Sequence, residues 1–230
     1  MTVNESPEPA ATPTAESTDE SGAAREERRP ADVAASHPVV STQVIHQGKI
    51  WDLASDEVDL GGEGPVVREY VLHPGAVAVI ALDDRERVLL LHQYRHPVRS
   101  KLWEPPAGIL DNHEESLQEA AARELAEEAD LLAGRWDVLA DYFTTPGSSD
   151  EAIRVFLARD LSSVPQDERH ERTDEERDME AVWVPLEDAL AAVLAGRIGN
   201  PSAVVGILAV AHARASGWQT LRPLDAPWVR

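Results

Sequence analysis

The sequence contains no cysteine, no long apolar run, and only 21 basic side chains against 42 acidic ones. The absence of cysteine excludes disulfides and thiolate chemistry, and it is compatible with a reducing cytoplasm. A net charge of -21 leaves no basic stripe that could follow a phosphate backbone, so we expect no nucleic-acid partner. Without a membrane-length apolar run or a signal peptide, we expect a soluble cytoplasmic protein that binds no membrane.

Composition divides the 230 residues into four segments. Residues 1–38 are rich in Glu, Ala, Pro, Ser and Thr, which predicts a disordered acidic tail. Residues 39–74 predict a small antiparallel sheet, because Val44–Leu53, Glu57–Leu60 and Val66–Leu72 alternate apolar and polar side chains. Residues 75–222 are long enough to bury the main core, and residues 223–230 are expected to form a C-terminal tail.

The main segment opens with two apolar runs, Ala76–Leu82 and Val88–Leu91, which are typical of strands buried on both faces. Further strands are predicted at Trp136–Tyr142, Ala152–Ala158 and Ala181–Pro185. Helices are predicted at Leu186–Ala195 and Pro201–Ser216. This order of elements predicts the α/β class.

The stretch from Trp103 to Leu131 places several carboxylates on one short helix. Ser116 followed by Glu119 is a capping box, which predicts a helix that begins at Leu117 and buries Leu117, Ala121 and Leu125. Glu124, Glu127 and Glu128 then lie on another side of the helix, where like charges repel each other. Arg123 is placed to pair with Glu127 or to reach back toward Glu115.

A divalent cation would reverse that repulsion. Mg²⁺ takes oxygen ligands and is held by one or two carboxylates together with substrate phosphates, and Glu124 and Glu128 have the required spacing. The Pro105–Gly108 turn adds a candidate main-chain carbonyl, because its glycine lets the backbone approach a neighbour closely. The alternative interpretation is a solvated acidic helix face.

Gly108, Glu115 and the run Arg123–Glu128 resemble the Nudix box, a glycine, a glutamate and then Arg-Glu-apolar-x-Glu-Glu-x-Gly. Two departures are present. The gap from Gly108 to Glu115 is one residue longer than the usual pattern, and Asp130 replaces the second glycine. Aspartate tolerates the left-handed conformation better than most residues, so we expect the turn at Asp130 to be kept.

The resemblance is to bacterial ADP-ribose pyrophosphatases, and it implies an α/β/α sandwich around a mixed sheet with an added N-terminal antiparallel sheet. The resemblance implies that this sheet packs across a homodimer and helps to build the partner's pocket, whereas the sequence alone also allows the sheet to cover its own domain. The resemblance also implies Mg²⁺, with Mn²⁺ as an alternative, held by Glu124, Glu128 and the carbonyl of Ala107, with Glu127 completing the cluster. Arg123, Glu127 and Glu128 are accordingly expected to be catalytic.

Three residues outside the helix are candidate substrate contacts. Arg95, at a strand end, has the geometry to fork onto a diphosphate, although it could instead pair with a nearby acid. The family's QYR-x-P element implies the substrate role, and we expect the adjacent Tyr94 to be a core residue. Glu104 and Pro146 match family positions near the site, while backbone pairing and an ordinary Pro-Gly turn explain them equally well.

The segment Gln166–Glu180 is dense in charge and is expected to form a solvated loop. In similar enzymes a glutamate on this loop activates the attacking water, and Glu175 aligns best with it, with Glu176 as the competitor. Asp150 and Glu151 are weaker candidates that would position the loop after Pro146.

The reaction expected from these features is hydrolysis of ADP-ribose to AMP and ribose 5-phosphate. Two alternatives are a sister hydrolase acting on a nucleotide sugar or a dinucleoside polyphosphate, and a non-catalytic ADP-ribose sensor. The sensor would lack the metal-binding glutamates and would carry a DNA-binding extension. Substrate choice depends on pocket shape, which the sequence does not define.

Overall fold

The computed structural model describes residues 30–112, 114–170 and 179–228. The chain divides into two units, residues 1–36 and residues 37–230, and every helix and strand below belongs to the second. The predicted tail at residues 1–38 therefore lies mostly outside the described residues. No helix within the described ranges is long and apolar enough to cross a membrane.

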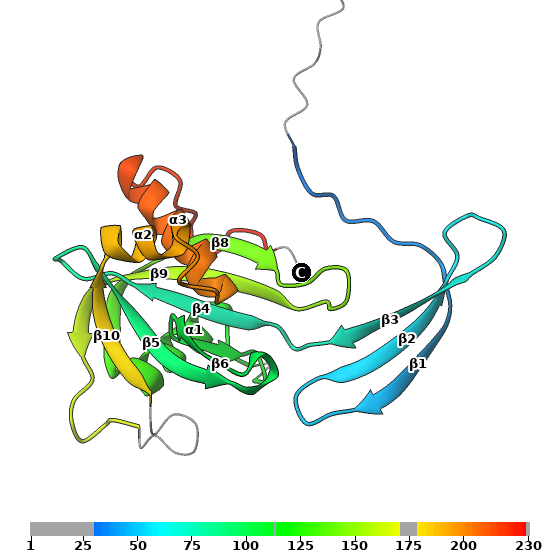
Figure 1. Cartoon of the computed structure of the whole chain (residues 1–230), viewed down its shortest axis with the longest axis horizontal. Helices are drawn as coiled ribbons and strands as arrows, with labels where there is room; N and C mark the ends of the chain where they lie inside the picture. Colours follow the sequence, from blue (N-terminus) through cyan, green and yellow to red (C-terminus); the bar gives the residue numbers. More distant parts are fainter. Residues whose placement is uncertain (1–29, 113, 171–178, 229–230) are drawn as a thin grey trace, which may run out of the picture. The chain divides into compact units, whose positions relative to one another are not determined.

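Three sheets, and helices packed on the sheets that contain β4 (Ala76–Ala81) and β5 (Arg87–Arg95), make up the described part of the second unit (Figure 1). The elements in chain order are β1 (Val39–Gln47), β2 (Asp52–Val58), β3 (Val66–Leu72), β4 (Ala76–Ala81), β5 (Arg87–Arg95), the 3-10 turn η1 (His96–Val98), β6 (Ser100–Glu104), β7 (Ala107–Ile109), α1 (Leu117–Ala129), β8 (Leu131–Phe143), β9 (Ala152–Ser163), β10 (Glu180–Pro185), α2 (Leu186–Leu194) and α3 (Pro201–Ala215).

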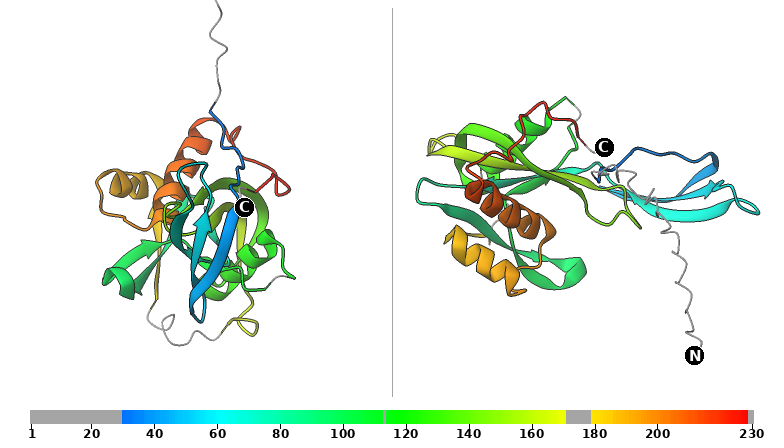
Figure 2. Two further views of the ribbon diagram at one scale, coloured as in Figure 1. Left: turned by 90° about the vertical axis from the view of Figure 1, so that its right-hand side faces the viewer. Right: turned by 90° about the horizontal axis from the view of Figure 1, so that it is seen from above.

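The central sheet has the order β7-β4-β9-β8 and is mixed, because β4 runs parallel to β9 and antiparallel to β7. A second sheet, β10-β5-β6, is antiparallel. Figure 2 shows α1 on the opposite side of the central sheet from α2 and α3. The α/β/α sandwich around a mixed sheet is therefore confirmed.

Strand β4 explains how two cores form on one sheet. All six of its residues are buried, and Ala76, Ala78 and Ile80 face α3 while Val77 and Val79 face α1. The continuous apolar run of β4 follows from this position, since neither face of the strand meets water. Gly206 of α3 lies against Ile80, where an added β-carbon would approach the Ile80 side chain to 2.6 Å.

The N-terminal strands form the expected antiparallel sheet, in the order β1-β2-β3. The prediction of one strand through Val44–Leu53 is wrong, because the chain turns between β1 and β2. Gly48 permits this turn: its amide donates to Asp52 Oδ1 at 3.1 Å, and a β-carbon there would overlap the Trp51 carbonyl oxygen. The alternating pattern alone did not reveal the turn.

The last described residues are attached to the central sheet. Arg154, which is 2% exposed, pairs with Asp141 and donates to the carbonyls of Ala226 and Pro227 at 3.1 and 2.9 Å. The backbone of Val138 also exchanges hydrogen bonds with Arg222. The segment that was expected to be a C-terminal tail thus packs on β8 and β9 over its described part.

Candidate functional site

Helix α1 begins at Leu117, as the capping box predicted. Ser116 Oγ accepts a hydrogen bond from the Glu119 amide at 3.2 Å, and the Glu119 carboxylate accepts one from the Ser116 amide at 2.9 Å. The bond from the Ser116 amide lowers the pKa of Glu119. The helix buries Ala120, Ala121 and Leu125, with Leu117 partly buried beside them. The opposite side of α1 is left for the charged residues.

Asp130 closes α1 in the left-handed conformation, with φ 53° and ψ 36°. Its amide donates to the Ala126 carbonyl at 3.1 Å. The turn that the family forms with glycine is therefore kept, as predicted from the sequence. Aspartate is strained in this conformation, and its negative charge lies at the negative end of the helix dipole.

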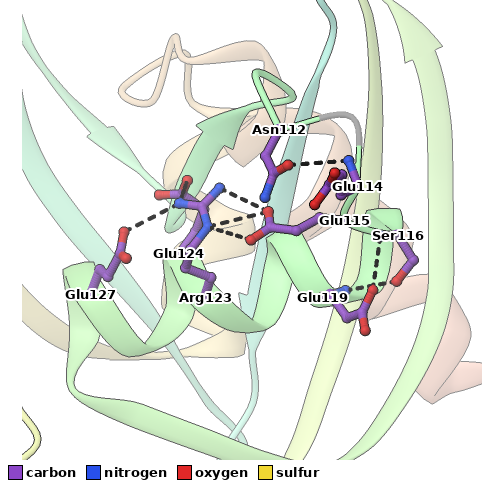
Figure 3. A network of polar contacts seen from close by, with 8 residues as sticks. All are labelled: Asn112, Glu114, Glu115, Ser116, Glu119, Arg123, Glu124 and Glu127. Carbon is purple, nitrogen blue, oxygen red and sulfur yellow. Dashed lines mark hydrogen bonds and ion pairs between the residues drawn. The ribbon is translucent and has the colours of Figure 1, made fainter.

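Arg123 lies at the centre of an acidic network (Figure 3). Its Nη1 is 2.6 Å from Glu124 Oε1 and 3.3 Å from Glu127 Oε2, while its Nε donates to Glu115 at 3.2 Å. Partial burial alone would lower the pKa of Arg123, but the carboxylates of Glu124, Glu115 and Glu127 outweigh it and raise that pKa. The guanidinium remains charged and offsets the repulsion among these acids.

Glu124 occupies the space that a side chain at residue 108 would fill. A β-carbon at Gly108 would overlap the Glu124 carboxylate and approach its Cγ to 2.6 Å. Gly108 pairs with Val77 in the β4–β7 ladder, so its backbone is fixed. The glycine therefore allows α1 to bring Glu124 against the edge strand β7.

Glu128 contacts the same edge strand through the backbone. Its Oε2 accepts a hydrogen bond from the Ala107 amide at 2.9 Å. The Val79 amide donates to the Pro106 carbonyl, and hydrogen-bonded pairs alternate along an antiparallel ladder. Ala78 and Ala107 therefore form a non-hydrogen-bonded pair, in which the amide and carbonyl of Ala107 point away from β4. The carbonyl of Ala107 leaves the strand on the same side as its amide, toward α1.

These donors fit a hard divalent cation in their chemistry, since they are carboxylate and carbonyl oxygens. Within the described residues no three acidic or histidine side chains converge as a ready-made metal centre. Glu124 and Glu127 turn toward Arg123, and Glu128 turns toward the Ala107 amide. Mg²⁺ does not require a cage made wholly of protein ligands, because waters and substrate phosphates complete its shell.

Arg95 and Glu104 lie together at the ends of β5 and β6. Arg95 Nε is 3.0 Å from both Glu104 oxygens, and its Nη2 is 2.6 Å from Oε2. Glu104 is only 3% exposed, so this carboxylate is held by the guanidinium rather than by water. Arg95 therefore does pair with a nearby acid, and that acid is Glu104, which is itself a candidate site residue.

The prediction that Tyr94 is a core residue is wrong. Tyr94 is 46% exposed, because its side chain lies at the end of the strand beside His96.

Pro146 lines a cavity of about 450 Å³ between β3 and the loop that follows β8. Arg68, Tyr70, Phe143 and Asp150 share its wall. Asp150 Oδ1 accepts from the His73 amide at 2.7 Å, and Glu151 accepts from Thr144 Oγ1 at 2.7 Å. Both acids hold the loop in place, which is the role expected for them.

A second cavity, of about 460 Å³, lies on the charged side of α1. Its wall combines Arg123, Ala126 and Glu127 of the helix with Glu168, Arg169 and His170 from the segment after β9. The sequence did not single out Glu168 or Arg169, because one charged residue in so dense a run resembles the next. The proposed base Glu175 and its competitor Glu176 lie outside the described residues.

Comparison with known proteins agrees with this architecture. The NUDIX domain model matches residues 72–203. An ADP-ribose pyrophosphatase of Mycobacterium tuberculosis is 45% identical over 190 residues, covering 83% of this chain and 90% of that protein. An ADP-ribose pyrophosphatase of Bacillus subtilis is 38% identical over 151 residues, covering 66% of this chain and 80% of that protein.

A solved structure described as an ADP compounds hydrolase superposes with a TM-score of 0.63 at 20% identity, covering 82% of this chain and 100% of that one. At this identity the likeness concerns the fold alone. The family model, however, covers more than half of the 230 residues and includes the glutamate helix and the Gly108 turn. This chain belongs to the Nudix family.

Proposed function

We propose that this protein hydrolyses the diphosphate bond of ADP-ribose to give AMP and ribose 5-phosphate, using Mg²⁺ or Mn²⁺. The observation that carries the proposal is the 45% identity over 190 residues to an ADP-ribose pyrophosphatase. The arrangement on α1 supports it, since Glu124, Glu127 and Glu128 face Arg123 and the β7 backbone rather than the core.

In this proposal Glu124, Glu128 and the Ala107 carbonyl hold the metal, with Glu127 beside them. Held by these residues, a divalent ion would supply positive charge at the diphosphate and would make the attacking water more acidic. Arg123 keeps Glu124 and Glu127 in position through its contacts of 2.6 and 3.3 Å. Arg95, oriented by Glu104, binds a diphosphate oxygen, and the loop at Pro146 forms part of the substrate pocket. Glu175 as the base that orients the water stays a prediction.

The direct test is a panel of purified substrates with Mg²⁺ or Mn²⁺, comprising ADP-ribose, a nucleotide sugar and a dinucleoside polyphosphate. We expect ADP-ribose to have the highest kcat/KM and to yield AMP and ribose 5-phosphate by mass spectrometry. A higher kcat/KM for either of the other substrates would contradict the proposed specificity. No turnover of any of them would contradict the enzymatic proposal.

Glu128→Gln is expected to keep the fold and remove most of the activity. Glutamine retains an oxygen that accepts from the Ala107 amide, but it lacks the charge that holds a divalent cation. The control is Glu119→Gln on the same helix, which preserves a capping box and should leave turnover unchanged. Wild-type turnover of Glu128→Gln at saturating Mg²⁺ would refute the metal role.

Gly108→Ala is expected to lower kcat/KM about tenfold or more, which corresponds to about 1.4 kcal/mol. The new methyl group must displace the Glu124 carboxylate from its place between Gly108 and Arg123. Stability should change by less than about 1 kcal/mol, because the displaced atoms end a flexible side chain. Gly64→Ala is the matched control, since no heavy atom lies within 4 Å of its β-carbon position. Equal activity in the two variants would show that the Glu124 position is unimportant.

Arg95→Ala is expected to affect stability and substrate binding through separate groups. Removing the guanidinium leaves the buried Glu104 carboxylate unpaired, at a cost of about 1–3 kcal/mol in unfolding free energy. Adding Glu104→Met, which leaves no buried polar group unpaired, should restore stability in denaturant titrations while KM stays raised by about tenfold. If the double variant also recovers the wild-type KM, Arg95 has only a structural role.

We also propose a cytoplasmic homodimer without nucleic-acid or membrane partners. The support for the dimer is the N-terminal sheet, where Val40, Ile45 and Val67 are 61%, 46% and 56% exposed. Exposed apolar groups gathered on one sheet are typical of an interaction surface. Light scattering in solution is expected to give twice the mass of the 25.1 kDa chain, and a monomer mass at micromolar concentration would contradict the dimer.

A further inference from the structure

Asp130 stands where the family's motif has glycine, and its surroundings give it a role that glycine could not fill. Its left-handed φ of 53° and its position at the C-terminus of α1 are both unfavourable for an aspartate. A residue with an unfavourable backbone conformation and an unfavourable charge is a candidate for a functional role when its contacts with another segment account for both.

The segment it contacts is residues 164–170, which follows β9. The Val164 amide donates to the Asp130 carbonyl at 2.9 Å. The Asp130 carboxylate lies 3.9 Å from Arg169 Nε, and the same Nε donates to the Val164 carbonyl at 3.3 Å. Asp130 therefore contacts the segment at its start through the backbone and near its end through the side chain.

The held segment forms one wall of the cavity on the charged side of α1. Glu168, Arg169 and His170 line that cavity together with Arg123 and Glu127. Arg123 and Glu127 belong to the proposed catalytic helix, and Asp130 caps the same helix. The contacts of Asp130 thus connect the end of α1 to the segment that supplies the other lining residues of the cavity.

We propose that Asp130 and Arg169 are positioning residues that hold the 164–170 segment against α1, and that the cavity on the charged side of this helix, which the segment helps to form, takes part in substrate binding beside the Pro146 loop. The inference rests on the proposed function. Asp130 holds the segment through Arg169 and the backbone of Val164, without contacting the reacting atoms. Loss of the pair lowers the fraction of molecules in which the segment is held, which raises the apparent dissociation constant by the inverse of that fraction.

The test compares Asp130→Asn, Arg169→Met and the double variant in ADP-ribose hydrolysis. Asparagine tolerates the left-handed conformation, so Asp130→Asn removes the charge without disturbing the helix cap. Because Arg169 is partly exposed, we expect KM to rise about three- to fivefold in each single variant, with kcat within about twofold of wild type. The double variant should be no worse than the poorer single variant, and Arg169→Lys should recover part of the loss.

Asp160→Asn is the matched control, since Asp160 is an exposed aspartate with φ 54° that does not line the cavity. It should leave KM unchanged. Single-variant effects that multiply in the double variant, or a fall in kcat with unchanged KM, would overturn the proposal.

Hydrogen exchange tests the same contact without reference to activity. Amides within residues 164–170 are expected to exchange faster in Asp130→Asn and Arg169→Met than in wild type, while exchange in α2 and α3 stays the same. Wild-type exchange rates in both variants would overturn the positioning role. Inactivity of the wild-type enzyme toward ADP-ribose, together with faster exchange in the variants, would instead refute the proposed function alone.

Discussion

The site depends on how α1 carries acids whose charges repel each other. Glu124, Glu127 and Glu128 lie within one turn and a half of helix, a spacing that destabilises an isolated helix. In the folded protein Arg123 holds two of them, and the Ala107 amide binds the third. The carboxylates are therefore kept as a group, oriented but partly accessible, at one edge of the central sheet.

The edge strand β7 lies beside the glutamates of α1 and adds backbone polar groups to them. Its three residues pair with β4 on one side only, so the other side presents backbone polar groups to α1. Gly108 lacks the side chain that would keep Glu124 away, and the Ala107 amide donates to Glu128. The helix thus supplies carboxylate oxygens and the strand supplies a carbonyl oxygen, which are the types of donor that hard divalent cations bind.

The remaining candidate residues are distributed around this centre by separate elements. Arg95 is held by a buried carboxylate at the ends of β5 and β6, and Pro146 belongs to a loop that Asp150 attaches to the residue after β3. Asp130 joins the helix end to the segment after β9. Within the described residues, Arg95, the Pro146 loop and the end of α1 are thus each held by a hydrogen bond or ion pair to a different part of the chain.

The sequence by itself determined what depends on local spacing. The capping box predicted that α1 begins at Leu117, and the motif predicted the turn at Asp130. The apolar run of β4 predicted a strand that is buried on both faces. Prediction from the sequence failed at Gly48, because the alternating pattern continues through a turn between two strands. It also failed at Tyr94, because the exposure of that side chain depends on where its strand ends.

Only the tertiary structure decided which distant residues meet. The pairing of Arg95 with Glu104, the contact of Glu128 with the Ala107 amide, and the approach of Arg169 to Asp130 join residues that local patterns treat separately. In a chain with 42 acidic residues almost any arginine has several prospective partners along the sequence. The choice among them is made by sheet register and helix packing, because these fix which side chains come within hydrogen-bonding distance.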